Sequence, residues 1–283
     1  MNFRTISRTD QQGSTTAQPI RTSRSAARRI KVWDAPTRLF HWLLVAAVTV
    51  AILTGREGGD WMALHGQAGL AVVGLVTFRL VWGVLGSTHA RFASFVPTPA
   101  RLRAYLSGRW SSHGHNPLGA LSVLALLGLL GAQAATGLVA DDEIAFTGPL
   151  AALIDQARSV QLTGLHHQLG DVLLWLIGLH VLAIVAYLAI RKNNLIKPMV
   201  TGYREADQGL DARGGGAVAF ALAVGAALLA VYAASGAFIP APPVSVPASA
   251  PASAPVSAPA SAPAAPASAA AAPALPPAPA PAW

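Results

Sequence analysis

Residues 165–180 read LHHQLGDVLLWLIGLH, an apolar stretch with histidines near both ends. The 14-residue separation of His166 and His180 corresponds to ~320° of rotation and ~21 Å of rise on an α-helix, so both imidazoles lie on one face near opposite ends. Ionisable side chains inside a hydrophobic helix are costly and tend to face a cofactor, a cavity or a partner. The stretch therefore predicts two sites at two depths along one helix.

The composition is typical of an integral membrane protein. Of the 283 residues, 53% are hydrophobic and only 11% are charged, whereas a soluble domain carries about 25% charged residues. The absence of cysteine excludes disulfides, zinc thiolate sites, iron–sulfur ligation and covalent haem attachment through cysteine. The net charge of +8 does not indicate nucleic-acid binding, because the 20 Lys and Arg residues concentrate in segments that flank apolar stretches.

Five apolar stretches approach the ~20 residues that are needed to cross a ~30 Å hydrocarbon core. They cover about residues 36–54, 62–85, 117–139, 164–190 and 216–238. Asp34 is the predicted N-cap of the first helix, and Pro36 lies in the first turn, where a missing N–H costs little. The expected fold class is an all-α integral membrane protein, with a four-helix transmembrane bundle and a fifth, C-terminal transmembrane helix.

The distribution of Lys and Arg predicts the topology, because these residues are enriched in cytoplasmic loops. Residues 1–35 hold seven of them, residues 87–116 hold four and residues 191–215 hold five, while the alternate loops hold one each. The N-terminus is therefore expected in the cytoplasm. Five spans then put the C-terminus outside.

The two ends of the chain differ from the apolar middle. Residues 1–31 lack the apolar core of a secretory signal and predict a disordered, basic cytoplasmic extension, with an organellar transit peptide as a minor alternative. Residues 239–283 consist mainly of Pro, Ala and Ser without charge, a composition that favours an extended, semi-rigid external spacer. That spacer is either a featureless tail or a tether to an envelope partner.

The topology assigns each histidine a depth. His41 and His180 lie near the cytoplasmic face, whereas His65 and His166 lie near the external face. Each pair is suited to hold one haem iron between two imidazoles, a coordination that exchanges electrons without binding oxygen. The alternative is that these histidines only form hydrogen bonds between helices. The neighbouring His167 points ~100° away from His166 and shares the ligand face poorly.

Two arginines are candidate partners of haem propionates. Arg79 lies late in the second span, and a buried arginine needs an anionic partner, although no acid lies within the first three spans. Snorkelling to the inner surface is the alternative for Arg79. Arg38, near the inner end of the first span, is a similar candidate.

Several segments resemble the bacterial di-haem cytochrome b561 family, which includes the b-type cytochrome subunits of nickel–iron hydrogenases. They are VWDAPTRLFHW (32–42), LHGQAGLAVVGLVTFRLVWGVLG (64–86), ARFASFVPTPARLRAYL (90–106), GHNPLGAL (114–121) and the opening stretch. The resemblance implies a four-helix domain that holds two haem b groups by bis-histidine ligation. The first and fourth helices share the inner haem, through His41 and His180. The second and fourth share the outer haem, through His65 and His166.

The resemblance, the apolar stretches and the charge distribution together predict a domain organisation. The cytochrome domain is expected at 32–203, and a cytoplasmic linker at 204–215 joins it to the fifth helix at 216–238. The Pro/Ala/Ser tail at 239–283 is expected to be periplasmic, in a multi-pass protein of the bacterial inner membrane. The fifth helix and the tail depart from the four-helix pattern of the family.

The expected function is transmembrane electron transfer between a periplasmic redox partner, such as a c-type cytochrome or a hydrogenase, and the quinone pool or a cytoplasmic acceptor. The resemblance implies a quinone site, but the sequence leaves its residues, the oligomeric state and any enzymatic role within a larger complex open. The alternatives are a metal-ion or solute permease that uses the histidines, and a non-redox membrane anchor. A permease predicts acids within the spans, broken helices or an inverted repeat, yet Asp171 is the one acid at membrane depth.

Overall fold

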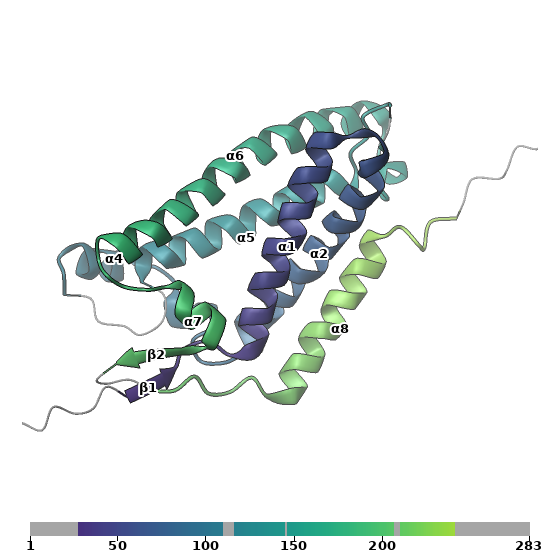
Figure 1. Cartoon of the computed structure of the whole chain (residues 1–283). Coiled ribbons are helices and arrows are strands. Elements are labelled where there is room, and N and C mark those ends of the chain that lie inside the picture. The colour runs from purple at the N-terminus through teal and green to yellow at the C-terminus, as the bar shows by residue number, and fades with distance from the viewer. Residues whose placement is uncertain (1–27, 110–115, 145, 207–209, 241–283) are drawn as a thin grey trace, which may run out of the picture. The chain divides into compact units, whose positions relative to one another are not determined.

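The computed structural model describes residues 28–109, 116–144, 146–206 and 210–240, which are mostly helical (Figure 1). Five of the described helices are long and apolar enough to cross a membrane: α1 (Ala35–Glu57), α2 (Met62–Leu85), α5 (Pro117–Leu138), α6 (Gln156–Ala189) and α8 (Gly216–Ala234). Shorter elements connect or flank them: β1 (Arg28–Lys31), the 3₁₀ helices η1 (Gly59–Trp61) and η2 (Ala151–Leu153), α3 (Phe92–Phe95), α4 (Pro99–Leu106), α7 (Ile196–Thr201) and β2 (Tyr203–Ala206). The predicted all-α membrane fold with a fifth helix is confirmed.

Side-chain caps fix the starts of α1 and α5. Asp34 caps α1, as predicted, by accepting a hydrogen bond from the Thr37 N–H at 2.7 Å, and Pro36 lies in the first turn. Asn116 caps α5 in the same way, through the Gly119 N–H at 2.7 Å. A cap satisfies one of the N–H groups that a helix start leaves without an intrahelical partner. Both helices therefore begin at a residue that the local sequence specifies.

The α6 helix starts earlier than its hydropathy predicts. The expected span began at about residue 164, whereas α6 begins at Gln156, directly after its N-cap Asp155. The Asp155 carboxylate accepts a hydrogen bond from the Arg158 N–H at 3.0 Å. The 34 residues of α6 correspond to ~51 Å of helix, so its polar first turns extend beyond a ~30 Å hydrocarbon core.

The α2 helix has the most neighbours among the long helices. It packs against α1, α5 and α8, and α5 packs in turn against α6. Gly74 permits the close approach of α8, because a Cβ at this position would lie 2.8 Å from Cγ2 of Val231. Two buried apolar clusters hold these helices together: Phe40, Phe78, Trp82, Ala90, Leu127 and Ala223 form one, and Val72, Val76, Leu130 and Leu173 form the other.

Most of the α6 surface is exposed. Of its side chains, only those of Ser159 and Leu173 are buried, and Trp175 is 82% exposed. In a bilayer the lipid chains are the solvent for such apolar side chains, so they need not be covered by protein. The exposed apolar surface of α6 is therefore what a lipid-facing helix requires.

A two-stranded sheet differs from the predicted disorder around residue 31. β1 pairs antiparallel with β2, with Arg28 opposite Ala206, where the sequence had suggested the end of a disordered extension and the start of a linker. Ile30 is fully buried against Val32 and Trp33, so the sheet has a small apolar core. A strand of four residues whose partner lies far along the chain leaves little local signal. Residues 1–27 and the tail from 241 onward lie outside the described residues.

Candidate functional site

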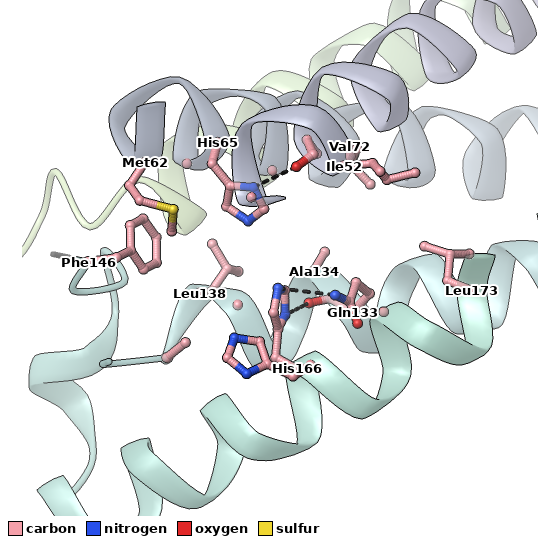
Figure 2. Close-up of a pocket in the computed structure, with 18 of the residues that line it drawn as sticks. Ile52, Met62, His65, Val72, Gln133, Ala134, Leu138, Phe146, His166 and Leu173 are labelled. Carbon is pink, nitrogen blue, oxygen red and sulfur yellow. Dashed lines mark hydrogen bonds between the residues drawn. The ribbon is translucent and has the colours of Figure 1, made fainter. Parts of the chain in front are cut away.

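A cavity of about 350 Å³ lies between α1, α2, α5 and α6, bounded also by the loop that carries Phe146 (Figure 2). Its volume falls within the ~300–1,000 Å³ range of pockets that hold small molecules and cofactors. Most of its wall is apolar, and its polar side chains include His65, Gln133, His166 and His167. The cavity therefore coincides with the outer site that the histidine pattern predicted.

His65 and His166 approach each other across this cavity. Their ring centroids are 6.1 Å apart and their ring planes make an angle of 82°. Figure 2 shows the two side chains pointing toward one another from α2 and α6. Two imidazoles that bind one metal from opposite sides through ~2 Å bonds have ring centroids about 6 Å apart. The spacing of this pair therefore fits one metal ion between the two rings.

The hydrogen bond of His65 leaves one ring nitrogen for a ligand. His65 Nδ1 lies 2.8 Å from the Ala51 carbonyl oxygen, which can only accept, so Nδ1 carries the proton and donates it. Nε2 is then the nitrogen that keeps a free lone pair. A metal-binding histidine commonly donates its other ring N–H to a carbonyl in this way, which fixes the tautomer and the ring orientation.

His166 has the same type of bond, and its ring makes two further contacts, one of which joins Nδ1 to the Thr136 hydroxyl at 3.3 Å. Its Nδ1 donates to the Gln133 carbonyl oxygen at 2.9 Å, and its Nε2 lies 3.1 Å from the Gln133 side-chain nitrogen. Metal binding at Nε2 requires this amide to turn away. The Gln133 Oε1 is buried and has no hydrogen-bond partner among the described residues, so the amide is poorly satisfied in its present position. The donor set fits a haem once Gln133 moves.

His167 is the neighbour that the sequence placed off the ligand face. It is exposed, and its ring centroid lies 6.2 Å from that of His166. It also lines the cavity, but the ring contacts that the structure gives for His65 are with His166 and Phe146. The geometry therefore favours His166 over His167 as the partner of His65.

The inner pair lies at the other end of the bundle, on α1 and α6. His41 on α1 and His180 on α6 are both half-buried. His180 Nδ1 lies 3.2 Å from the Ser122 hydroxyl on α5, and His41 packs edge-on against Trp42. The structure thus brings His65 and His166 together across one cavity, and it places His41 and His180 at the opposite end of the bundle, on α1 and α6.

Arg79 is buried, with 3% of its surface exposed. Its guanidinium carbon lies 4.8 Å from the centre of the Phe92 ring, and the carboxylate of Asp34 acts on it electrostatically. Sequence reasoning missed this acid because Asp34 precedes the first span and was interpreted only as a cap. Arg79 Nη1 has no hydrogen-bond partner among the described residues, so it can still bind an anionic group.

Arg38 also has one unpaired nitrogen. Its Nη1 donates to the Val200 carbonyl oxygen, whereas its buried Nε has no hydrogen-bond partner among the described residues. A second cavity, of about 490 Å³, is lined by Arg38, Trp42 and Phe220. Arg38 is therefore a cation at the end of the bundle where the inner pair lies.

Gln133 and Phe146 complete the outer site, and sequence reasoning missed both. Gln133 is the single amide side chain of a helix whose other polar side chains are the small hydroxyl residues Ser122 and Thr136, a signal that could have identified it. Phe146 packs edge-on against His65 with ring centroids 6.2 Å apart, but it lies in a loop whose sequence gave no such indication. Only the folded arrangement brings this loop to the cavity.

Comparisons with known proteins agree with this arrangement. The family model described as prokaryotic cytochrome b561 matches residues 32–202. The probable Ni/Fe-hydrogenase 1 B-type cytochrome subunit of Escherichia coli is 25% identical over 214 residues, which cover 61% of this chain and 89% of that protein. The probable Ni/Fe-hydrogenase B-type cytochrome subunit of Cupriavidus necator is 29% identical over 216 residues, which cover 61% and 86%. No solved structure matches. The chain belongs to the prokaryotic cytochrome b561 family and is a multi-pass membrane protein that transfers electrons through haem b.

Proposed function

We propose that the protein carries single electrons across the membrane through two haem b groups, one between His65 and His166 and one between His41 and His180. The observation that carries this proposal is the outer pair, whose ring centroids lie 6.1 Å apart across a largely apolar cavity. The four histidines would hold haem, which would supply a one-electron carrier that exchanges electrons without binding oxygen.

Side chains of this protein would orient the histidine ligands and neutralise the negative charge of the haem propionates. His65 and His166 each donate Nδ1–H to a backbone carbonyl, which directs Nε2 toward the cavity. The unpaired nitrogens of Arg79 and Arg38 would neutralise propionates near the inner pair. The single helix α6 carries one ligand of each pair, and their 14-residue separation corresponds to ~21 Å along the helix. Two haems at this separation would divide electron transfer across the membrane into shorter transfers.

The names of the relatives support a redox partner. Both are probable B-type cytochrome subunits of Ni/Fe hydrogenases. We therefore propose a hydrogenase, or alternatively a c-type cytochrome, as the partner in the periplasm, with the quinone pool or a cytoplasmic acceptor at the other side. Any quinone-reactive role belongs to the complex with that partner.

The proposed setting is the bacterial inner membrane. The Lys and Arg residues in segments 1–35, 87–116 and 191–215 support a cytoplasmic N-terminus and a periplasmic tail at 239–283. The cytochrome domain then spans 32–203, the linker spans 204–215, and the fifth helix spans 216–238.

The absorption spectrum of the purified protein tests the proposal. We expect a reduced b-type haem signal that corresponds to two haems per chain, and two components in a redox titration. A single component at one haem per chain would contradict the di-haem arrangement. A protein without haem would leave a permease or an anchor as the function.

A further inference from the structure

Two short segments on different helices hold the outer histidines in the same way. Each begins with a residue whose carbonyl binds an imidazole, and continues to a Thr-Gly pair three and four positions later. We call them the α1 seat (Ala51, Thr54 and Gly55) and the α5 seat (Gln133, Thr136 and Gly137).

The α1 seat holds His65. His65 Nδ1 donates to the Ala51 carbonyl oxygen at 2.8 Å. One turn further along α1, Gly55 lies directly against the ring, because a Cβ added there would be 2.9 Å from both Nδ1 and Cε1 of His65. The Thr54 hydroxyl donates to the carbonyl oxygens of Val50 at 2.6 Å and Ala51 at 3.3 Å.

The α5 seat repeats this arrangement around His166. Its Nδ1 donates to the Gln133 carbonyl oxygen at 2.9 Å and also lies 3.3 Å from the Thr136 hydroxyl, a direct contact that is not seen between Thr54 and His65 in the described structure. A Cβ added to Gly137 would lie 2.8 Å from Cε1 and 3.1 Å from Nδ1 of the His166 ring. The Thr136 hydroxyl donates to the carbonyl oxygens of Ala132 at 2.9 Å and Gln133 at 3.0 Å. The same three roles therefore recur at the same spacing on a second helix.

Each residue type has a physical reason for its position. A carbonyl inside a helix already accepts the N–H of the residue four positions later, so an imidazole reaches it only where that later residue has no side chain in the way. Glycine provides this access. A threonine hydroxyl that bonds to a carbonyl one turn earlier often bends a helix, which turns the carbonyl outward. Together these residues fix the tautomer and orientation of the ring.

We infer that the two Thr-Gly seats are positioning elements for the outer haem, which set the ring angle and basicity of both axial ligands. This inference rests on the proposed function, because it takes His65 and His166 as those ligands. The seats act through the histidines and leave the inner pair unaffected, since neither seat contacts His41 or His180 in the described structure.

Alanine at either glycine tests the inference. In Gly55→Ala and Gly137→Ala the added methyl group displaces the imidazole and breaks its bond to the carbonyl. Alanine is a better helix former than glycine, so the helices themselves are preserved. We expect each variant to lose the outer haem or to shift its reduction potential and its electron paramagnetic resonance signal, with the inner component unchanged. The control is Gly131→Ala on α5, where an added Cβ meets nothing within 4 Å.

Threonine variants separate positioning from packing. Thr54→Val and Thr136→Val remove the hydroxyl at similar volume, and we expect a smaller potential shift of the outer component than in the glycine variants. Thr54→Ser and Thr136→Ser keep the hydroxyl and should restore the wild-type potential.

The outcomes distinguish the inference from the proposed function. If His65→Ala and His166→Ala lose one haem while both glycine variants keep the wild-type outer signal, the inference about the Thr-Gly seats is wrong. The assignment of His65 and His166 as ligands is then retained. Equal losses in Gly131→Ala would also overturn the seats, because a general packing effect would then explain them. If the histidine variants retain both haems, the proposed ligands are wrong and the seats fail with them.

Discussion

The two ends of the bundle hold their histidine pairs by different means. At the outer end, His65 and His166 both bond to backbone carbonyls of neighbouring helices. At the inner end, His180 bonds to the Ser122 hydroxyl, and Arg79 on α2 is a buried cation beside the Phe92 ring. Backbone carbonyls are fixed by the helices that carry them, whereas a hydroxyl rotates. The outer histidines are therefore oriented by the fold before any cofactor binds. The inner end instead has a buried positive charge, that of Arg79.

The largest expected effect is the loss of one haem from one end. His166→Ala should remove the outer component and His180→Ala the inner one, because each takes away an axial ligand. His167→Ala is the matched control and should retain both, since the ring of His167 does not face His65. Haem content and redox titration of the purified variants measure this. Loss of the outer component in His167→Ala alone would reverse the assignment of the two adjacent histidines.

A smaller effect is expected from the charge at the inner end. Arg79→Gln removes a buried cation that stabilises added negative charge, so the potential of the inner component should fall, on the order of tens of millivolts. The outer component should not change. Arg103→Gln on α4 is the control, because Arg103 is exposed. If Arg79→Gln shifts the reduction potential of the outer component, or changes neither potential, then Arg79 does not stabilise charge at the inner haem.

The outer end should respond weakly to loss of the Gln133 side chain. Its amide contacts His166 Nε2 at 3.1 Å and competes with a metal there. Gln133→Ala keeps the backbone carbonyl, so we expect haem retention to improve by about the worth of one hydrogen bond, ~0.5–1.5 kcal/mol. Transfer of haem to an acceptor protein measures retention, and exposed Gln168→Ala is the control. Faster haem loss from Gln133→Ala would mean that the amide helps to hold the group.

The smallest effect concerns the sheet beside the inner end. The Lys31 N–H donates to Asp211 at 2.8 Å, and this bond, helped by Arg28, lowers the pKa of the Asp211 carboxyl. A lowered pKa means that the contact stabilises the fold above the ordinary value of 3.8 and is lost as pH falls below it. The protection of the Lys31 amide, measured as its exchange rate relative to the intrinsic rate at the same pH, should therefore fall below about pH 4. Asp211→Asn should remove this pH dependence. If the protection of the Lys31 amide depends on pH in the variant as it does in the wild type, the Asp211 carboxyl is not the titrating group.

Much of the fold follows from the sequence, because hydrophobic length and caps are local properties. The second span was predicted at about 62–85, and α2 covers Met62–Leu85. The early start of α6 was missed because its first turns are polar. The pairing of β1 with β2 was missed because it joins residues far apart in the chain.

The candidate site was only partly predictable. The four histidines follow from helical periodicity and topology. The acid near Arg79 and the contact of Phe146 with His65 depend on which helices and loops become neighbours. The close contacts of Gly55 and Gly137 with imidazoles depend on the same packing, and no spacing within one helix reveals them.

Electron transfer across a membrane by the purified protein tests the central claim most directly. The protein is reconstituted in vesicles that enclose an electron acceptor, and a membrane-impermeant reductant is added outside. We predict reduction of the enclosed acceptor by the wild type, and reduction at the rate of protein-free vesicles for both His65→Ala and His41→Ala. Wild-type rates in either variant, or no transfer by the haem-loaded wild type, would contradict the account.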